Sequence, residues 1–216
     1  MNRIAVICPT KGRLEQAIRA YESMVATSTL ADMVWCVDEV DREVYLPESN
    51  RERLRLMSFP IYDPAPRVNA AVACVPEYEV YGMMTDDAEF TTPGWDLWVL
   101  DRYAEFPGRI GVVSPFHNAG PWCNFPYISR EWFNVVGWFA CPDTRFYCWD
   151  GVLEILGEST HIAHAQEHEF GIQHHLMYSD WQAQSLVTDG AKFLAWHQYG
   201  RRTDTQKLRA AISAAQ

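Results

Sequence analysis

Three short apolar runs constrain the fold of this chain more than any other feature. Residues 3–9, 33–37 and 80–84 are almost entirely apolar, and each run stops at polar or charged side chains. An uninterrupted apolar run of this length is typical of a strand that is buried on both faces, as in a parallel sheet covered by helices. Residues 54–59, where apolar and polar side chains alternate, form a further strand candidate.

Segments with helical periodicity separate these strands. After the first run, apolar side chains recur with the 3.6-residue period of one helix face, at Leu14, Ala17, Ile18, Tyr21, Met24 and Val25. Residues 67–75 predict a short helix, because Pro76 pushes the residue before it out of the helical region. The order strand, helix, strand, strand, helix, strand predicts an α/β fold with a mostly parallel mixed sheet flanked by helices.

The second half of the chain is less regular, and its elements are predicted from local signals. Pro93-Gly94-Trp95 opens a helix through about residue 102, and Ser129 is a candidate N-cap for a helix that starts at Arg130. The remaining candidates are a strand at 110–113, a loop at 114–125, a helix at 151–156, a strand at 160–164 and a helical tail at 203–216. Since no linker or repeat divides the chain, we expect one domain over residues 1–216.

Charge and composition exclude several classes of protein. The chain has 28 acidic and 18 basic residues, and the resulting formal charge of −10 disfavours a general nucleic-acid binder. No apolar run approaches the roughly 18 to 20 residues that span a bilayer, so we expect no membrane span and a cytoplasmic location. The six cysteines show no paired spacing, which favours reduced, packed thiols over disulfides.

Chemically useful side chains follow the apolar runs directly. Residues 10–13 follow the first run, Asp38 follows the second, and Asp86 with Asp87 follows the run at 80–84. Parallel α/β sheets bind ligands beyond the carboxyl ends of their strands. We therefore expect these three groups of side chains to meet at one edge of the sheet.

The adjacent carboxylates of Asp86 and Asp87, with Glu89 two positions further on, repel one another. A divalent cation or a network of sugar hydroxyls would relieve that repulsion. The alternative is an acidic turn in water. The apolar strand before the pair favours a site, because it carries the two carboxylates from the core to the ligand-binding edge.

Four motifs occur in order along the chain: Pro9-Thr10-Lys11-Gly12-Arg13 after the first strand, an acidic residue after the second, Arg67 and Asn69 at the start of a helix, and Asp86-Asp87 followed by Pro93-Gly94-Trp95-Asp96. The series covers most of residues 3–170. It resembles the GT-A glycosyltransferases, particularly the family 2-like group and its phage-borne relatives. The resemblance implies a GT-A fold with a nucleotide-binding half at about 1–100 and an acceptor half with a C-terminal helical tail at about 101–216.

The resemblance also implies roles for individual residues. It implies that the donor is held by Pro9, Thr10 and Arg13 in the nucleotide pocket, Asp38 on the base, Arg67 and Asn69 on nucleotide or phosphate, and Asp86 with Asp87 at the start of the metal and ribose motif. The chain departs from the family at Ala88, where a third metal-binding side chain is usual. Either Glu89 substitutes for it, or Asp87 binds Mn²⁺ or Mg²⁺ together with only diphosphate and water.

Five histidines crowd into a short stretch of the second half: His161, His164, His168, His174 and His175. Members of the family often place a late histidine on the metal. His164, at the end of a strand candidate, is our first choice over His168, and the alternative is an ordinary surface or core histidine. The spacing of His164 and His168 differs from that of zinc proteases, because the glutamate between them follows the wrong histidine.

Two further residues of the second half are candidates for the reaction itself. Asp150 matches a carboxylate at the head of a helix that acts as the catalytic base of inverting family members. A base must accept the proton of the attacking hydroxyl, whereas the alternative role of Asp150 is an ordinary helix N-cap. Trp122, in a loop rich in proline and glycine, is a candidate for stacking on a sugar.

The leading hypothesis is an inverting, metal-assisted, hexosyltransferase-like enzyme that transfers a sugar from a nucleotide-diphosphate donor, with UDP-sugars favoured. The acceptor stays open, with nucleic acid disfavoured as an acceptor. A sugar nucleotidyltransferase is one alternative, although only Gly12 is present of the glycine-rich, lysine-ended loop usual in those enzymes. A non-catalytic nucleotide-sugar or carbohydrate-binding protein of the same fold is another, which Ala88 would permit.

Overall fold

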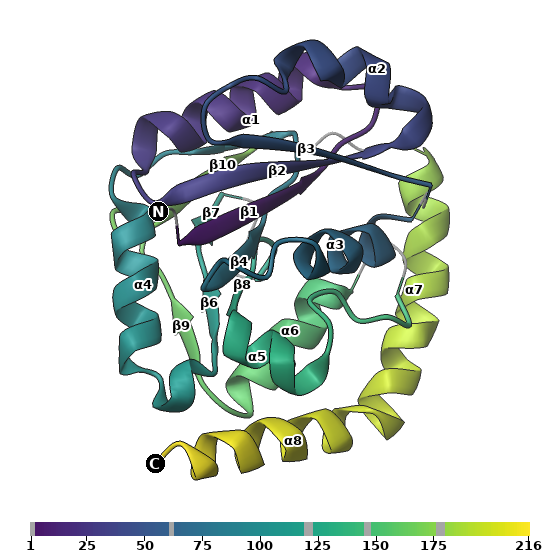
Figure 1. Ribbon diagram of the computed structural model, residues 1–216. Coiled ribbons are helices and arrows are strands. Elements are labelled where there is room, and N and C mark those ends of the chain that lie inside the picture. Colours follow the sequence, from purple (N-terminus) through teal and green to yellow (C-terminus); the bar gives the residue numbers. More distant parts are fainter. Residues whose placement is uncertain (1–2, 61–62, 119–122, 145–147, 176–179) are drawn as a thin grey trace.

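A seven-stranded mixed sheet runs through the centre of the molecule, and a three-stranded sheet lies beside it (Figure 1). The computed structural model describes residues 3–60, 63–118, 123–144, 148–175 and 180–216. The strands are β1 (Ile4–Pro9), β2 (Ala31–Asp38), β3 (Leu54–Phe59), β4 (Val80–Met83), β5 (Ala88–Phe90), β6 (Val112–Ser114), β7 (Phe116–His117), β8 (Tyr127–Ser129), β9 (Ile162–His164) and β10 (Gly171–His174). The helices are α1 (Leu14–Thr27), α2 (Arg42–Tyr45), α3 (Pro64–Ala73), α4 (Trp95–Glu105), α5 (Arg130–Val136), α6 (Trp149–Glu158), α7 (Asp180–Tyr199) and α8 (Arg201–Ala214).

The strand directions place most carboxyl ends at one edge of the large sheet. Its order is β3-β2-β1-β4-β8-β6-β9, and the first four strands are mutually parallel. Strand β8 is antiparallel to both β4 and β6, and β9 is parallel to β6, so β6 and β9 run in the same direction as β1. The predicted mostly parallel α/β sheet is confirmed.

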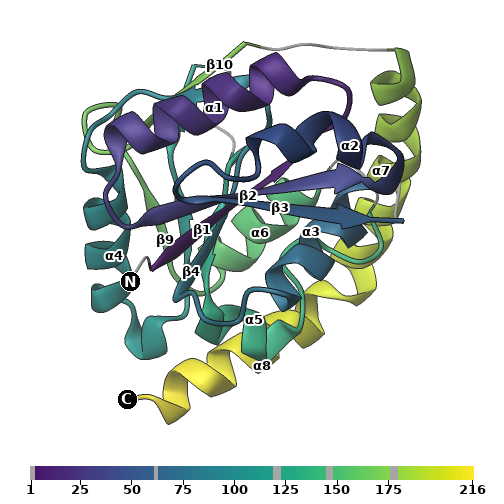
Figure 2. The same ribbon diagram turned by 45° about the horizontal axis from the view of Figure 1, so that its top comes forward.

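Strands β1, β2 and β4 are buried on both faces, which explains the uninterrupted apolar runs. Along β1, Ala5 and Ile7 pack into a core with helices α3, α5, α6 and α8, whereas Ile4, Val6 and Cys8 pack into a second core with α1 and α4. Figure 2 shows α1 on one side of the strands and α3 on the other. Successive side chains of a strand point to opposite faces, so a strand covered on both sides is apolar at almost every position.

Glycine at position 82 lets β4 and β8 pack closely. Gly82 pairs with Tyr127, and a β-carbon built on Gly82 would lie 2.0 to 2.4 Å from atoms of the Tyr127 ring. The Tyr127 ring is fully buried in the core shared with Trp95 and Phe170. A side chain at position 82 would therefore displace an aromatic ring of the core.

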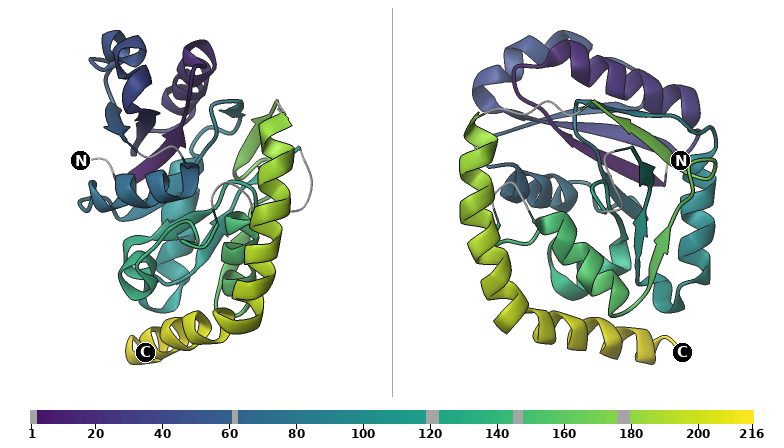
Figure 3. Two further views of the ribbon diagram at one scale, coloured as in Figure 1. Left: turned by 90° about the vertical axis from the view of Figure 1, so that its right-hand side faces the viewer. Right: turned by 180° about the vertical axis from the view of Figure 1, so that it is seen from behind.

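Helices α3 and α7 differ most from the predictions. Helix α3 begins at Pro64 and not at Arg67, because proline is tolerated in the first turn, where its missing N–H has no intrahelical partner. Helix α7 was not predicted; it runs along the side of the molecule and meets α8, which crosses one end (Figure 3). Ser129 caps α5 as predicted, since its hydroxyl accepts from the backbone N–H of Trp132. None of the described helices is long and apolar enough to cross a bilayer.

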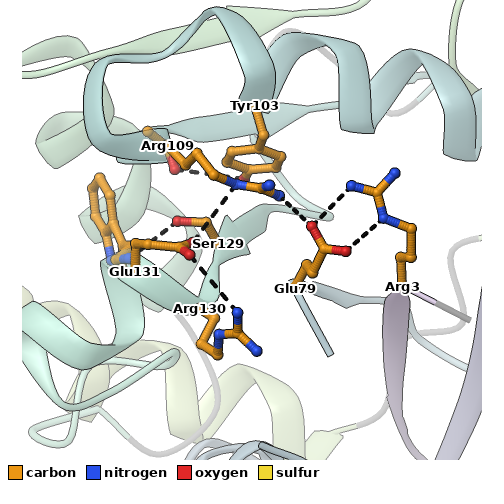
Figure 4. A network of polar contacts seen from close by, with 9 residues as sticks. Arg3, Glu79, Tyr103, Arg109, Ser129, Arg130 and Glu131 are labelled. Atoms are coloured by element: carbon orange, nitrogen blue, oxygen red, sulfur yellow. Dashed lines mark hydrogen bonds and ion pairs between the residues drawn. The ribbon is translucent and has the colours of Figure 1, made fainter. Parts of the chain in front are cut away.

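A polar network fixes the amino ends of the central strands. Glu79, just before β4, accepts two hydrogen bonds from Arg3, at 2.6 and 2.8 Å, and forms an ion pair with Arg109 at 2.9 Å (Figure 4). These arginines, Arg3 foremost, lower the pKa of Glu79 to about 2. Arg109 also lies 3.9 Å from Glu131 at the start of α5. The network therefore ties β1 and β4 together at the edge opposite the polar cluster described next.

Candidate active site

Thr10 joins the ends of β1 and β4. Its hydroxyl donates to Asp86 Oδ2 at 2.8 Å and lies 2.9 Å from the hydroxyl of Tyr45. Thr10 and Asp86 are both buried, with 3% of each residue exposed. The predicted meeting of the β1 and β4 ends is therefore a direct contact, because parallel neighbouring strands bring their carboxyl ends together.

Arg13 bridges the two adjacent carboxylates. Its Nη1 lies 3.2 Å from Asp86 Oδ1 and 3.7 Å from Asp87 Oδ2. Burial raises the pKa of Asp86 to about 6, although the Arg13 charge and the Thr10 hydroxyl act against the rise. A buried carboxylate pair is costly without a counter-charge, and here the chain supplies one itself.

His174, and not a neighbour of Asp87 in sequence, faces the Asp87 carboxylate. The small sheet has the order β5-β10-β7, and the antiparallel register of β5 and β10 pairs His174 with Ala88. His174 Nε2 consequently lies 3.4 Å from Asp87 Oδ1. Ala88 has no ligating side chain, but its partner on the neighbouring strand, His174, places an imidazole next to Asp87.

Three hydrogen bonds hold the β5–β10 ladder in place. The backbone N–H of His175 donates to the Asp87 carbonyl at 2.8 Å, and Asn118 makes two hydrogen bonds to the His174 backbone. The Trp95 ring stacks against both Phe90 of β5 and Phe170 before β10, with centroid distances of 4.6 and 4.8 Å, and the two phenylalanine rings lie 6.1 Å from each other. Trp95 is therefore a core residue that supports the site.

Asp38, at the end of β2, is held by two cations. Arg67 on α3 pairs with Asp38 Oδ1, and Lys11 Nζ lies 2.8 Å from Asp38 Oδ2. Arg67 and Asp38 are buried, whereas 46% of the Lys11 side chain is exposed. Since Lys11 belongs to the loop that also carries Thr10 and Arg13, the ends of β1, β2 and β4 form one connected polar cluster.

The remaining predicted donor residues lie around this cluster in different environments. Pro9 is the last residue of β1, paired with Cys36 of β2. The Asn69 side chain accepts from the backbone N–H groups of Phe139 and Ala140 at 2.8 Å each and donates to the Ala140 carbonyl at 2.7 Å. Asn69 thus anchors the segment after α5, and its nucleotide contact stays a prediction.

The other predicted metal ligands lie apart from the carboxylate of Asp87. Glu89 points toward His175 Nε2, 3.1 Å away, and toward Arg19 of α1. His164 ends β9, where it pairs with Ser114 and is exposed, and His168 is also exposed. His174 is therefore the histidine that the structure brings to Asp87. It is placed there by the pairing of β5 with β10, which a local sequence motif does not reveal.

Asp150 lies at the same edge of the sheet as the polar cluster. Helix α6 leads into β9 and packs on β6 and β9, so it runs opposite to these strands and begins at their carboxyl ends. Asp150 is in the first turn, after the N-cap residue Cys148, and accepts from the Gly151 N–H at 2.8 Å. Burial raises the pKa of Asp150 to about 6, and the neighbouring Glu154 adds to the rise. Trp122 lies outside the described residues.

The donor set around Asp87 is small but suits a divalent ion. An imidazole nitrogen 3.4 Å from a carboxylate oxygen is favourable only if the nitrogen carries a proton or a cation binds both atoms. A carboxylate and a neutral imidazole are ligands that Mn²⁺ accepts. Within the described part of the chain, no three His, Cys, Asp or Glu side chains gather around one point. Asp87 and His174 therefore fit an ion whose other ligands are supplied by a substrate and water.

Known structures share this architecture although sequences do not reveal it. No family model and no curated protein sequence matches the chain. A mannosyltransferase from Pyrobaculum calidifontis, in complex with GDP-Man and Mn²⁺, superposes with a TM-score of 0.66 at 13% identity over 99% of this chain and 74% of that one. Glucosyl-3-phosphoglycerate synthase from Mycobacterium tuberculosis, in complex with Mn²⁺, UDP and glucosyl-3-phosphoglycerate, also superposes with a TM-score of 0.66. The sequence identity is 14%, over 90% of this chain and 79% of that one.

The fold is that of a GT-A glycosyltransferase. The likeness extends over nearly the whole chain, including the half that follows β4. Open α/β sheets bind ligands beyond the carboxyl ends of their strands. In this chain that edge carries the cluster of Thr10, Arg13, Asp38, Asp86 and Asp87.

Proposed function

We propose that this chain is a glycosyltransferase that transfers a sugar from a nucleotide-diphosphate donor to an acceptor hydroxyl. One observation carries the proposal: the contacts that connect Thr10, Arg13, Asp86, Asp87 and His174 lie at the sheet edge from which Asp150 also emerges. A cluster that can hold a charged donor and a carboxylate that can take a proton are the two parts that sugar transfer requires.

The donor would bind in the half of the chain formed by residues 1–100. We assign it to Pro9, Thr10, Arg13, Asp38, Arg67, Asn69 and Asp86. Asp38 would accept from the base, and Lys11, whose side chain is 46% exposed beside Asp38, would pair with the diphosphate. UDP-sugars are our first choice because a structural neighbour holds UDP, and GDP-sugars are the second because another holds GDP-Man.

Asp87 and His174 would hold the divalent ion, with Mn²⁺ favoured over Mg²⁺ because one ligand is an imidazole. When bound, such an ion neutralises charge that develops on the departing diphosphate. Arg13, 3.7 Å from Asp87, lies close enough to contribute to the same stabilisation through hydrogen bonds.

Asp150 would act as the base in the acceptor half, residues 101–216, where Trp122 is a candidate for stacking on the acceptor. The ionised carboxylate takes the proton of the acceptor hydroxyl, and the oxygen forms a bond to the anomeric carbon as the bond to the diphosphate breaks. The electron pair of the broken bond leaves with the nucleotide diphosphate. Attack from the face opposite the leaving group inverts the anomeric carbon.

Calorimetric titration with UDP-glucose and GDP-mannose, with and without MnCl₂, tests the donor site. We expect at least one donor to bind, and more tightly with Mn²⁺. The absence of binding for these donors and for their thymidine and cytidine counterparts would contradict the proposal.

The Asp150→Asn variant tests the reaction. We expect it to keep donor binding and to lose most release of nucleotide from the donor, with water or a sugar as acceptor. Glu158→Gln, on the exposed last turn of α6, is the matched control and should behave like the wild-type protein. Donor binding without any nucleotide release by the wild-type protein would favour the non-catalytic binding protein instead.

A further inference from the structure

The oxygens of Asp86 and Asp87 are all engaged by donors of the chain itself. Asp86 Oδ2 accepts from Thr10, Asp87 Oδ1 faces His174, and the two remaining oxygens lie next to Arg13. Both aspartates are at least nine-tenths buried. A pair of buried carboxylates normally attracts a cation from solution, but this pair already has one.

The position of Arg13 is built into the fold. Gly12 adopts a left-handed backbone conformation, with φ of 64°, and directs the chain from β1 into α1. The backbone N–H of Arg13 then donates to the Tyr45 hydroxyl at 3.1 Å, and that hydroxyl is itself held by Thr10. The Arg13 side chain keeps 36% of its surface exposed. The backbone of Arg13 is therefore fixed, whereas its guanidinium group can exchange one anionic partner for another.

We propose that Arg13 is a resident counter-cation of the Asp86–Asp87 pair and competes with a divalent ion for Asp87. While the Arg13 guanidinium pairs with Asp87 Oδ2, only Asp87 Oδ1 and His174 Nε2 are available as protein ligands for the ion. The positive charge of the guanidinium also repels the ion. Free Mn²⁺ then binds weakly. A diphosphate gives Arg13 a second anionic partner and gives the ion additional oxygen ligands, so the ion and the nucleotide bind cooperatively.

This inference rests on the proposed function only for the identity of the diphosphate. Competition between Arg13 and an ion for Asp87 requires neither a donor sugar nor transfer. The test therefore uses Mn²⁺ alone, and a protein that transfers no sugar would still give a result.

The experiment titrates the protein with MnCl₂ in the absence of nucleotide and follows the electron paramagnetic resonance signal of free Mn²⁺. We expect Arg13→Gln to bind Mn²⁺ about tenfold more tightly than the wild-type protein, because a nearby like charge is removed from a partly buried site. Arg102→Gln, which removes the same charge from α4, should leave the affinity unchanged. Equal affinities of the wild-type and Arg13→Gln proteins would overturn the proposal.

A second pair of variants guards against unfolding of Arg13→Gln, which leaves both carboxylates without their counter-cation. Asp86→Asn keeps Arg13 on Asp87, and the double variant Arg13→Gln with Asp86→Asn removes one charge of each sign. We expect the double variant to bind Mn²⁺ about tenfold more tightly than Asp86→Asn alone. An unchanged affinity in this pair would also overturn the proposal.

Nucleotide provides the complementary measurement. In the wild-type protein, saturating UDP should tighten Mn²⁺ binding strongly, and this enhancement should shrink severalfold in Arg13→Gln, where free Mn²⁺ already binds well. An enhancement of the same size in both proteins would show that Arg13 does not link the two ligands.

Discussion

Asn118 holds the backbone of His174 from both sides. Its Nδ2 donates to the His174 carbonyl at 3.1 Å, and its Oδ1 accepts from the His174 N–H at 2.7 Å. Strand β7 ends at His117, and the side chain of the next residue, Asn118, makes hydrogen bonds to the backbone of β10 in place of a further strand residue. The position of the imidazole relative to Asp87 therefore depends on the side-chain amide of Asn118.

The Asn118→Ala variant should weaken Mn²⁺ binding in the presence of UDP by about tenfold, the usual effect of removing a group that orients a metal ligand. The measurement is calorimetric titration with MnCl₂ at saturating UDP. Gln173→Ala, at the exposed neighbouring position of β10, is the matched control and should change the affinity little. An equal loss in both variants would assign the effect to the ladder as a whole.

Replacement of single histidines separates His174 from the predicted ligands His164 and His168. We expect His174→Ala to lower the affinity for Mn²⁺ with UDP by about tenfold or more, because it removes one of two protein ligands. His164→Ala and His168→Ala should bind as the wild-type protein does, since both side chains are exposed and, among the described residues, neither gathers with Asp87 and His174 around one point. A loss confined to His164→Ala would restore the original assignment.

The pH dependence of donor hydrolysis should report Asp150. Because the pKa of Asp150 is raised to about 6, the carboxyl group is mostly protonated at pH 5 and mostly ionised at pH 7. A base acts in its ionised form, so kcat should rise about tenfold over this interval and level off above it. Nucleotide release measured from pH 5 to 8 gives the profile.

The Glu154→Gln variant checks the cause of that profile. Glu154 lies one helical turn after Asp150, and its negative charge raises the pKa of Asp150. Removing the charge should move the midpoint to lower pH, whereas Glu158→Gln should leave it in place. A midpoint that moves to higher pH in Glu154→Gln would contradict the assignment of Asp150 as the titrating base.

Replacement of Gly82 should show how closely β4 and β8 pack. Gly82→Ala places a methyl group inside the Tyr127 ring, and we expect a loss of about 1 to 3 kcal/mol or more in the free energy of unfolding. Gly190→Ala in α7 meets no atom within 4 Å and should stabilise the protein by up to about 1 kcal/mol. Urea denaturation of the two variants measures both changes, and a Gly82→Ala protein as stable as the wild type would contradict the expected clash.

The first half of the fold was predictable because its signals are local. The alternating segment of residues 54–59 coincides with β3, and the periodic face that starts at Leu14 coincides with α1. The contact of Thr10 with Asp86 followed from the shared direction of the strands that carry them. Parallel strands convert positions in the sequence into positions at one edge, which is why motifs far apart could be expected to meet.

The second half was less predictable because its elements depend on distant partners. Strands β7 and β8 are short segments within or next to a loop rich in proline, and their pairing with β10, β4 and β6 decides that they are strands. His174 was one of five crowded histidines, and sequence position favoured His164 instead. Only the register of β10 against β5 distinguishes the two, and a single sequence does not display that register.

The pairing of His174 with Ala88 makes the integrity of the small sheet a condition for ion binding. The imidazole lies next to Asp87 only while β5 and β10 are paired. In the paired state the backbone N–H of His175 donates a hydrogen bond to the Asp87 carbonyl. An ion bound to both Asp87 and His174 would therefore also stabilise this ladder against opening. In the presence of Mn²⁺ and UDP, the amide protons of this ladder should exchange with deuterium more slowly, while those of β2 and β3 keep their rates.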